Sequence, residues 1–452
     1  MASDSSTGRA AVDIVTAADP GWDEARRAWN LAVDQRPEMV VLPASTDEVA
    51  AAVRQARQAG LRVAVQGTGH GGAARGPLEG AMLINTSRMR GVAVDGHGRS
   101  ARAAAGALWM DVVPAAAEHG LAALHGTGPD VGVVGYTLGG GVGWLGRRHG
   151  LASNAVTAFE LVTPAGEVVR ADAETEPDLF WALRGGGGSF GVVTAVEFRL
   201  FHVESVNAGW LIWPWEEARR VLSRWAEWAG TVPDEVASVG RLLQVPPLPH
   251  LPDPVRGRQL AVVEAAILAG EAEAGRLLAP LRELDPEIDT FAQMPPTGLA
   301  TLHMDPPEPV PGIGNGGLID DMPAEAVDAF VAAAGPGSGS PLLSVEARLV
   351  GGALARVPDG AGALARLDGG FLLYGVGMLM PPATVDALRA AVAGLIAAMA
   401  PWGRERSLLG FTEIPTDTRA MFEPEVHRRL AEIRARVDPQ GLLLANHPIP
   451  TV

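Results

Sequence analysis

Between residues 38 and 205, short apolar runs alternate with segments in which apolar side chains recur every three or four positions. The runs EMVVLP (38–43), LRVAVQG (61–67), AMLINTSRM (81–89) and GVAVD (91–95) are typical of strands. Residues 45–60 predict a helix, because Ser45 is a good N-cap, acidic residues follow it, and Gly60 can end the helix. This alternation predicts an α/β layer around a buried sheet.

The same pattern continues to residue 200. Residues 108–120 predict a second helix that ends at Gly120. Residues 158–171 predict a β-hairpin with its turn at 164–166, and residues 178–200 predict a helix, a glycine-rich loop and a strand.

After residue 206 the pattern changes. Strand-like runs at 259–268, 342–350 and 371–379 alternate with amphipathic helical segments at 269–284 and 382–400. They predict a second, α+β lobe with an antiparallel sheet and helices on one face. Tryptophans gather at its start and are expected to pack this lobe: Trp210, Trp213, Trp215, Trp225 and Trp228.

Composition narrows the possible functions. A chain of 452 residues favours two domains. Its formal charge of −16 argues against nucleic acid or an anionic membrane as a partner. The sequence has no cysteine, which excludes disulfides, thiolate metal sites and cysteine nucleophiles, and we predict no metal cofactor. The N-terminus resembles no secretory signal, and the apolar stretch 387–400 is short for a bilayer, so we expect a cytoplasmic protein.

Three glycine-dense stretches, at 66–72, 125–150 and 184–191, stand out within the first 205 residues. The first, QGTGHGG, nearly matches a dinucleotide-binding fingerprint, but the residues after it contain a proline and no apolar stripe, so no helix would meet the phosphates. Such loops instead suit a nest of backbone N–H groups for a pyrophosphate. Ordinary tight turns are the alternative for each loop taken singly.

Four stretches resemble the signature regions of FAD-linked oxidases, in the berberine-bridge-enzyme-like branch of the vanillyl-alcohol oxidase superfamily. They are VAVQGTGHGG, GTGPDVGVVGYTLGGGVGWLGRRHGLASN, DLFWALRGGGGSFGVVTAVEFRL and VDPQGLLLANHPI, and the resemblance covers nearly the whole chain. It implies an α+β fold: a two-part FAD-binding lobe of PCMH type, and a substrate lobe with an antiparallel sheet and flanking helices. The implied domains are residues 1–205, completed by 408–452, for FAD, and 206–407 for substrate.

The resemblance implies that His70 is bonded through its ring to the flavin 8α-methyl carbon. Many relatives add a second bond from a cysteine, where this chain has Gly128, so a single covalent link is expected. The implied cofactor-binding residues are Gln66, Gly67, Thr68, Gly69, His70, Gly71, Gly128, Pro129, Val131, Gly132, Gly135, Tyr136, Gly139, Gly140, Gly141, Gly143, Gly150, Leu151, Asn154, Gly191, Val193, Asn446 and His447. Gly126 stands where a small residue leaves room for dioxygen, which favours an oxidase.

The usual catalytic base of this family is a tyrosine late in the chain, and Leu408 occupies its position. Tyr374 lies on a predicted strand that aims it either at the flavin or into the core. Glu346 and Arg348 lie two positions apart on a predicted strand and therefore share one face. They are expected to form either a buried acid–base pair that faces the cofactor or an ion pair on the surface. Glu413 is another candidate base, and the alternative is a solvated charge at a strand end. Tyr136 is expected either to contact the pyrimidine edge of the flavin or only to fill space beside the cofactor.

We therefore expect an FAD-dependent oxidoreductase that oxidises a small organic or secondary-metabolite substrate, an alcohol or an amine, by hydride transfer to flavin N5. Dioxygen is the expected electron acceptor, with hydrogen peroxide as product. The alternatives are a flavin dehydrogenase or oxidative cyclase that releases no peroxide, and a flavin-carrying binding protein without redox turnover. The loss of the usual base means that the base has moved or that none is needed.

Overall fold

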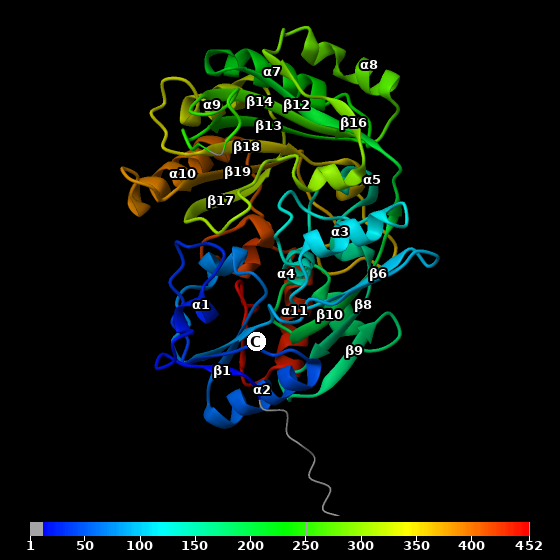
Figure 1. Cartoon of the computed structure of the whole chain (residues 1–452), viewed down its shortest axis with the longest axis vertical. Helices are drawn as coiled ribbons and strands as arrows, with labels where there is room; N and C mark the ends of the chain where they lie inside the picture. The colour runs from blue at the N-terminus through cyan, green and yellow to red at the C-terminus, as the bar shows by residue number, and fades with distance from the viewer. Residues whose placement is uncertain (1–11, 250, 452) are drawn as a thin grey trace, which may run out of the picture.

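The computed structural model describes residues 12–249 and 251–451. The first sheet combines strands from the N-terminal and C-terminal parts of the chain, in the order β1-β2-β4-β3-β20. The strands are β1 (Ile14–Val15), β2 (Met39–Val41), β3 (Arg62–Gln66), β4 (Ala81–Asn85) and β20 (Leu443–Leu444). β20 pairs in parallel with β3, so the C-terminal segment completes a sheet built from the N-terminal part (Figure 1).

A second sheet of five strands follows in the order β5-β6-β10-β8-β9. Its strands are β5 (Val92–Asp95), β6 (Ser100–Ala104), β8 (Val156–Val162), β9 (Val168–Asp172) and β10 (Val192–Arg199). A short pair, β7 (Leu121–Ala122) and β11 (Phe201–His202), lies apart from it. The helices of this half are α1 (Trp22–Arg26), α2 (Thr46–Ala59), α3 (Trp109–Ala117), α4 (Val133–Leu138), α5 (Gly146–His149), α6 (Pro177–Leu183) and α11 (Pro424–Val437).

The third sheet has eight strands and forms the upper lobe in Figure 1. Its main path runs β15-β12-β14-β13-β18-β19-β17, and β16 pairs with β12. The strands are β12 (Val206–Pro214), β13 (Val236–Gln244), β14 (Gln259–Ile267), β15 (Ile288–Asp289), β16 (Ala292–Met294), β17 (Gly312–Ile319), β18 (Ser344–Leu349) and β19 (Phe371–Met378). Its helices are α7 (Ala218–Ala229), α8 (Glu271–Arg282), α9 (Ala324–Ala334) and α10 (Val385–Met399).

The two faces of the third sheet have different partners. On one face, side chains such as Leu373 and Ala347 pack against Trp225 of α7, Phe330 of α9 and Leu395 of α10. The other face packs against the lower lobe, and its apolar contacts are grouped around Trp144, Leu145, Trp210, Ile212 and Val239. The lobes therefore meet on the face of the sheet that the helices leave free.

Local signals in the sequence are confirmed where they concern single elements. In α2, the Ser45 hydroxyl accepts a hydrogen bond from the Glu48 N–H, and Gly60 ends the helix with φ of 69°. The hairpin forms as β8 and β9, and the α+β fold class is confirmed. The division into a domain of 1–205 with 408–452 and a domain of 206–407 stays a prediction.

Among the described residues, one helical stretch, Val385–Trp402, is long and apolar enough to cross a membrane by length and composition alone. The sequence predicts a core helix at 382–400, and α10 forms there but buries only one face, with 22% of the stretch Val385–Trp402 buried. Its side chains Leu388, Val392 and Leu395 are buried, and the latter two belong to the cluster beneath the third sheet.

Candidate active site

His70 begins a short 3-10 helix (His70–Arg75) directly after β3. The residue before it, Gly69, has φ of 92°, and a Cβ there would lie 2.7 Å from the Ala28 Cα, so only glycine fits. The chain before α2 thus passes close behind the histidine. This close approach positions the His70 ring.

The His70 ring is enclosed by three side chains. Trp29 stacks on it with 4.1 Å between ring centroids, and the Thr68 hydroxyl lies 2.8 Å from its Nδ1. The Asp130 Oδ1 lies 3.8 Å from its Nε2, and Asp130 also accepts a hydrogen bond from the Trp29 indole. Burial lowers the pKa of His70 to about 4, which leaves the imidazole neutral and able to act as a nucleophile at neutral pH.

The C-terminal motif lies beside the glycine turn. A Cβ at Gly71 would come 2.7 Å from the Asn446 amide nitrogen, so backbone and side chain touch. The next residue, His447, is buried, and its Nε2 lies 2.9 Å from the Thr412 carbonyl oxygen as a donor. Three segments that are distant in the sequence, at 67–71, 408–413 and 446–447, therefore converge.

Tyr136 lies in α4 within the second glycine-rich region. Its ring meets Trp109 edge-on at 5.4 Å, and a Cβ at Gly126 or Gly141 would come within 2.9 or 2.5 Å of that ring. Its hydroxyl is buried and finds no hydrogen-bond partner among the described residues. The ring therefore fills the space left by Gly126 and the neighbouring glycines, while its polar end stays available to a ligand.

The face of the third sheet toward the lower lobe carries five charged or phenolic side chains in two neighbouring rows. In one row, Tyr374 of β19 lies opposite Glu346 of β18, which lies opposite Arg241 of β13. In the other row, Arg348 and Glu264 flank Val239. Because strand residues two apart share a face, all five point away from the covering helices.

These groups form a buried ion network around His303. The His303 Nδ1 lies 2.5 Å from a Glu264 oxygen, its Nε2 lies 2.9 Å from a Glu346 oxygen, and Arg241 lies 2.9 Å from Glu264. Burial favours a neutral imidazole, but the Glu264 and Glu346 carboxylates raise the pKa of His303 to about 9. Arg348, 2.6 Å from Glu346, helps to lower the pKa of that carboxyl despite its burial. Glu346 and Arg348 are therefore the buried pair, not a surface pair.

Tyr374 donates a hydrogen bond from its hydroxyl to the Glu413 carboxylate. Burial raises the pKa of Glu413, and burial together with the Glu413 charge raises that of Tyr374 well above its usual range. The Glu413 N–H in turn donates to the Asn315 side chain at 3.1 Å. Both residues lie at the sheet face that meets the flavin motifs, which makes them a candidate pair for proton transfer.

Leu408 gives this site no group for proton transfer. Its side chain is buried in an apolar cluster with Val142, Leu151 and Leu318. The same cluster encloses Phe411 at its edge, and Phe411 meets the Tyr374 ring edge-on at 5.8 Å. The position of the family's tyrosine thus serves packing here, and Tyr374 of β19 lies nearby.

Asp305 is a charged residue of the site that sequence reasoning missed. Its carboxylate accepts a hydrogen bond from the Thr127 hydroxyl at 2.7 Å, which connects the two lobes. Its neighbour Met304 has φ of 55°, a conformation that a side chain rarely adopts. Asp305 lies in the proline-rich loop before β17, where no periodicity or motif marks it.

Two predicted cofactor residues have their side chains engaged within the protein. Gln66 accepts a hydrogen bond from Gln35 at 2.6 Å and donates to the Arg27 carbonyl. Asn154 accepts from the Gly362 N–H and donates to the Ala365 carbonyl, so it holds a loop of the upper lobe. Their part in flavin binding stays a prediction, as does that of the remaining predicted residues.

Those remaining residues lie on three segments. Pro129, Val131, Gly132 and Gly135 lead into or begin α4, and a Cβ at Gly132 would lie 3.6 Å from Thr68. After α4 come Gly139, Gly140 and Gly143, followed by Gly150 and Leu151 at the end of α5. Gly191 and Val193 stand at the start of β10, which pairs with β8.

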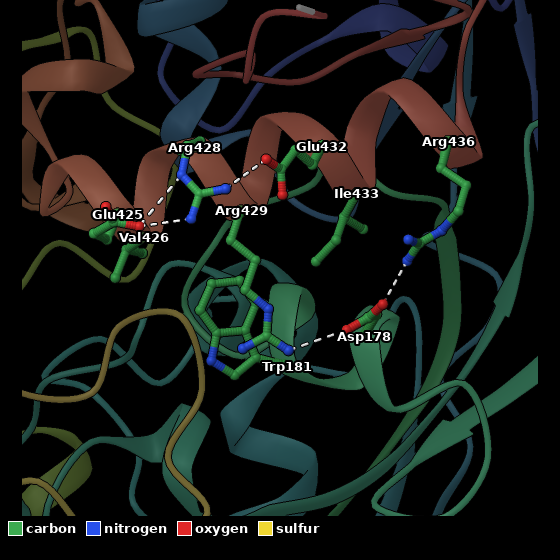
Figure 2. A pocket seen from close by; sticks show the side chains of 9 residues that line it. All are labelled: Asp178, Trp181, Glu425, Val426, Arg428, Arg429, Glu432, Ile433 and Arg436. Carbon is green, nitrogen blue, oxygen red and sulfur yellow. Dashed lines mark hydrogen bonds and ion pairs between the residues drawn. The ribbon is translucent and has the colours of Figure 1, made fainter.

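Two surface grooves are present as well. One, of about 500 Å³, lies between α11 and α6 and contains none of the predicted site residues (Figure 2). Its Asp178 pairs with Arg429 at 3.0 Å and with Arg436 at 2.7 Å, so these charges serve helix packing. The other, of about 360 Å³, includes Gly150 and Asn154.

The residues present fit a bound FAD. At Gly69 and Gly71 a neighbouring segment approaches the backbone so closely that a Cβ would clash. Such exposed, closely packed backbone is typical of a nest of N–H groups that binds a pyrophosphate. The Tyr136 hydroxyl and the His447 Nδ1 are buried polar atoms that find no hydrogen-bond partner among the described residues, and a polar ring edge would satisfy them. The neutral His70 is suited to covalent attachment.

Comparison with known proteins gives the class. Residues 37–172 match the FAD-binding-domain family model. An uncharacterised FAD-linked oxidoreductase of Bacillus subtilis is 30% identical over 315 residues, which span 69% of this chain and 67% of that protein. The (R)-6-hydroxynicotine oxidase of Paenarthrobacter nicotinovorans is 36% identical over 202 residues, but this match spans only 44% of each chain.

Solved structures agree over nearly the full length. A crystal structure of 6-hydroxy-D-nicotine oxidase from Arthrobacter nicotinovorans has a TM-score of 0.82 and 25% identity, and the match covers 96% of both chains. A glucooligosaccharide oxidase from Acremonium strictum, described as having a novel flavinylation, shares the fold with a TM-score of 0.81 and 22% identity, covering 98% of this chain and 96% of that one.

Fold, site and relatives together define a flavin-dependent oxidoreductase. The chain belongs to the FAD-linked oxidoreductases, and it shares its fold with berberine-bridge-enzyme-like proteins. The resemblance seen in the four sequence motifs is therefore confirmed, and so is the prediction of an FAD-linked enzyme.

Proposed function

We propose that this protein is an oxidase of small organic alcohols or amines, with FAD held by one covalent bond to His70. The observation that carries the proposal is that the segment of the neutral, ring-stacked His70 meets residues 408–413 through Asn446 and His447. In that segment, Glu413 accepts a hydrogen bond from Tyr374 of the upper sheet, which gives a pair for proton transfer. Bound FAD would accept a hydride at N5 and pass the electrons to dioxygen, which yields hydrogen peroxide.

Tyr374 and Glu413 would take the proton that leaves the substrate. An alcohol or amine that is oxidised loses a hydride from carbon and a proton from oxygen or nitrogen. The phenol can receive that proton while it passes its own to the Glu413 carboxylate, with which it already shares a hydrogen bond. Glu346 and Arg348 lie beside Tyr374 on the sheet and would orient the substrate.

Several finer features belong to the same proposal. A small-molecule substrate fits relatives that include oxidases of hydroxynicotine and of oligosaccharides. A single tether follows from Gly128, since the chain has no cysteine. We propose a cytoplasmic enzyme of secondary metabolism, with no nucleic-acid or membrane partner, in keeping with its charge of −16.

The test uses the protein purified with its flavin. Precipitation in acid should leave the pellet yellow in the wild type and colourless in His70→Ala. A panel of alcohols, sugars and amines should include members that bleach the flavin without oxygen and that produce peroxide in air. Bleaching without peroxide would identify a dehydrogenase, and a flavin that no substrate reduces would contradict the proposal.

A further inference from the structure

Asp305 lies at the junction between the flavin anchor and the upper sheet. Its Oδ2 accepts the hydrogen bond from Thr127, and a Cβ at Gly128 would lie 3.7 Å from the same oxygen. Its Oδ1 lies 3.9 Å from the His303 Nε2. Its negative charge opposes the lowering of the His70 pKa by burial and helps to raise the pKa of Tyr374, so the carboxylate is close to the proposed anchor and to the proposed proton acceptor.

Other carboxylates of this region already have strong partners. Glu264 and Glu346 pair with arginines, Glu413 accepts from Tyr374, and Asp130 accepts from Trp29. Asp305 has weaker partners: within the described residues its one side-chain hydrogen bond comes from a neutral hydroxyl, its charged neighbour His303 lies at 3.9 Å, beyond hydrogen-bond distance, and 33% of the side chain is exposed. Asp305 thus retains oxygen lone pairs for a group that enters from solvent.

The surroundings of Asp305 favour a cation. The charges of Asp305 and Glu308 both help to raise the pKa of Asp130, so three acidic groups lie near one another on this side of His70. Such a grouping creates a negative potential that attracts positive ligands. The strained backbone at Met304 and the bond from Thr127 fix the carboxylate rather than let it turn into solvent.

We propose that Asp305 binds the positively charged nitrogen of the substrate, so that the site selects protonated amines over neutral alcohols and sugars of similar shape. The inference rests on the proposed function, because it names the substrate class of the same site. A charge-assisted hydrogen bond to Asp305 would supply the selectivity. Thr127 is a positioning residue for this carboxylate.

The test measures binding rather than turnover. Isothermal titration calorimetry at pH 7 on the flavin-loaded protein compares cyclohexylammonium with cyclohexanol, and benzylammonium with benzyl alcohol. The cation of each pair should bind at least about tenfold more tightly. Asp305→Asn, which keeps the shape, should reduce this preference to less than about twofold. Thr127→Val should reduce it in part, and Asp386→Asn, at an exposed acid on α10, should leave it unchanged.

The inference is overturned if the cations bind no better than their neutral counterparts, or if neither binds. It is also overturned if the Asp305→Asn variant keeps the preference for cations. Thermal unfolding of each variant verifies that it is folded. The proposed function is tested separately, by the colour of the acid-precipitated pellet and by flavin bleaching across the wider panel. A redox-active enzyme without cation preference therefore fails only the inference about Asp305.

Discussion

Tyr374 and Glu413 come from different parts of the chain and meet through one hydrogen bond at the junction of the lobes. Tyr374 is fixed by its place on β19 opposite Glu346, while Glu413 is fixed by its backbone bond to Asn315 of β17. In the proposed function, a phenol and a carboxyl from separate segments would take the place of the single tyrosine whose position Leu408 occupies. The site would then have a proton acceptor although the usual motif is lost.

We predict that Glu413→Gln lowers kcat by about 100-fold or more, because an amide cannot accept the proton that Tyr374 passes on. Tyr374→Phe should have a similar effect, and both variants should keep yellow, covalently bound flavin. Steady-state kinetics with an identified substrate measure the loss. Asn315→Ala serves as the milder control, since it removes only the support of Glu413.

The pH dependence distinguishes a base from a structural role. Because burial raises the pKa of Glu413, the carboxylate forms only above the usual range of glutamate, and kcat should rise with pH through that raised value. Glu413→Gln should give a flat profile there. A wild-type profile that matches that of Glu413→Gln would show that substrate oxidation needs no proton acceptor at this position.

The enclosure of His70 predicts how covalent flavin attachment responds to mutation. Trp29→Phe keeps an aromatic ring on His70 but removes the indole donor to Asp130, and Asp130→Asn removes the nearby charge. Both should reduce the covalent fraction several-fold after expression, because a histidine that is less well oriented attacks more slowly. The ratio of flavin absorbance in the acid pellet to that in the supernatant measures the covalently bound fraction. Trp181→Phe, in the remote groove of Figure 2, should behave as the wild type.

The buried ion network predicts a pH-dependent stability. The pKa of His303 is raised to about 9 in the folded protein, against 6.5 for an unperturbed histidine. Its contribution is therefore complete below pH 6.5 and is lost as the pH rises from 6.5 to 9. The free energy of unfolding of the wild type should fall across this window, whereas that of His303→Gln should not.

The same variant should be less stable than the wild type at pH 6 by about 3 kcal/mol, since the buried Glu264 and Glu346 side chains would lose the imidazolium that lies between them. The double variant His303→Gln, Glu264→Gln should recover part of this loss, because it removes one of the two buried carboxyl groups that contact His303. Urea unfolding at several pH values measures both effects. Equal pH slopes for the wild type and His303→Gln would contradict a charged His303.

Elements whose signals are local could be predicted from the sequence. Ser45 and Gly60 fix the ends of α2 because capping needs only neighbouring residues, and the periodicity of β18 put Glu346 and Arg348 on one face. What the sequence leaves open is which face becomes buried. The answer depends on His303 and Arg241, which come from a distant loop and from another strand.

In the site, too, residues of continuous motifs could be predicted from the sequence, whereas residues placed by distant contacts could not. His70 and its glycines form a continuous motif, so their placement beside the C-terminal Asn446 could be expected from the resemblance. Asp305 could not be found this way, because a single acid in a proline-rich loop carries no pattern. Its place is set by Thr127, a residue of the other lobe, 178 positions away.

Gly69 gives the last prediction. Gly69→Ala must adopt φ of 92° and also place a Cβ 2.7 Å from the Ala28 backbone, whereas Gly80→Ala must adopt φ of 69° with nothing within 4 Å of its Cβ. The Gly80 variant should lose only about 1 kcal/mol for its conformation, and the Gly69 variant about 2–3 kcal/mol more, since the chain must move. Urea unfolding compares the two. Because the shift displaces the turn that holds His70, Gly69→Ala should also lose covalent flavin while Gly80→Ala keeps it; equal stability and equal flavin content in the two variants would show that Ala28 can yield without disturbing the anchor.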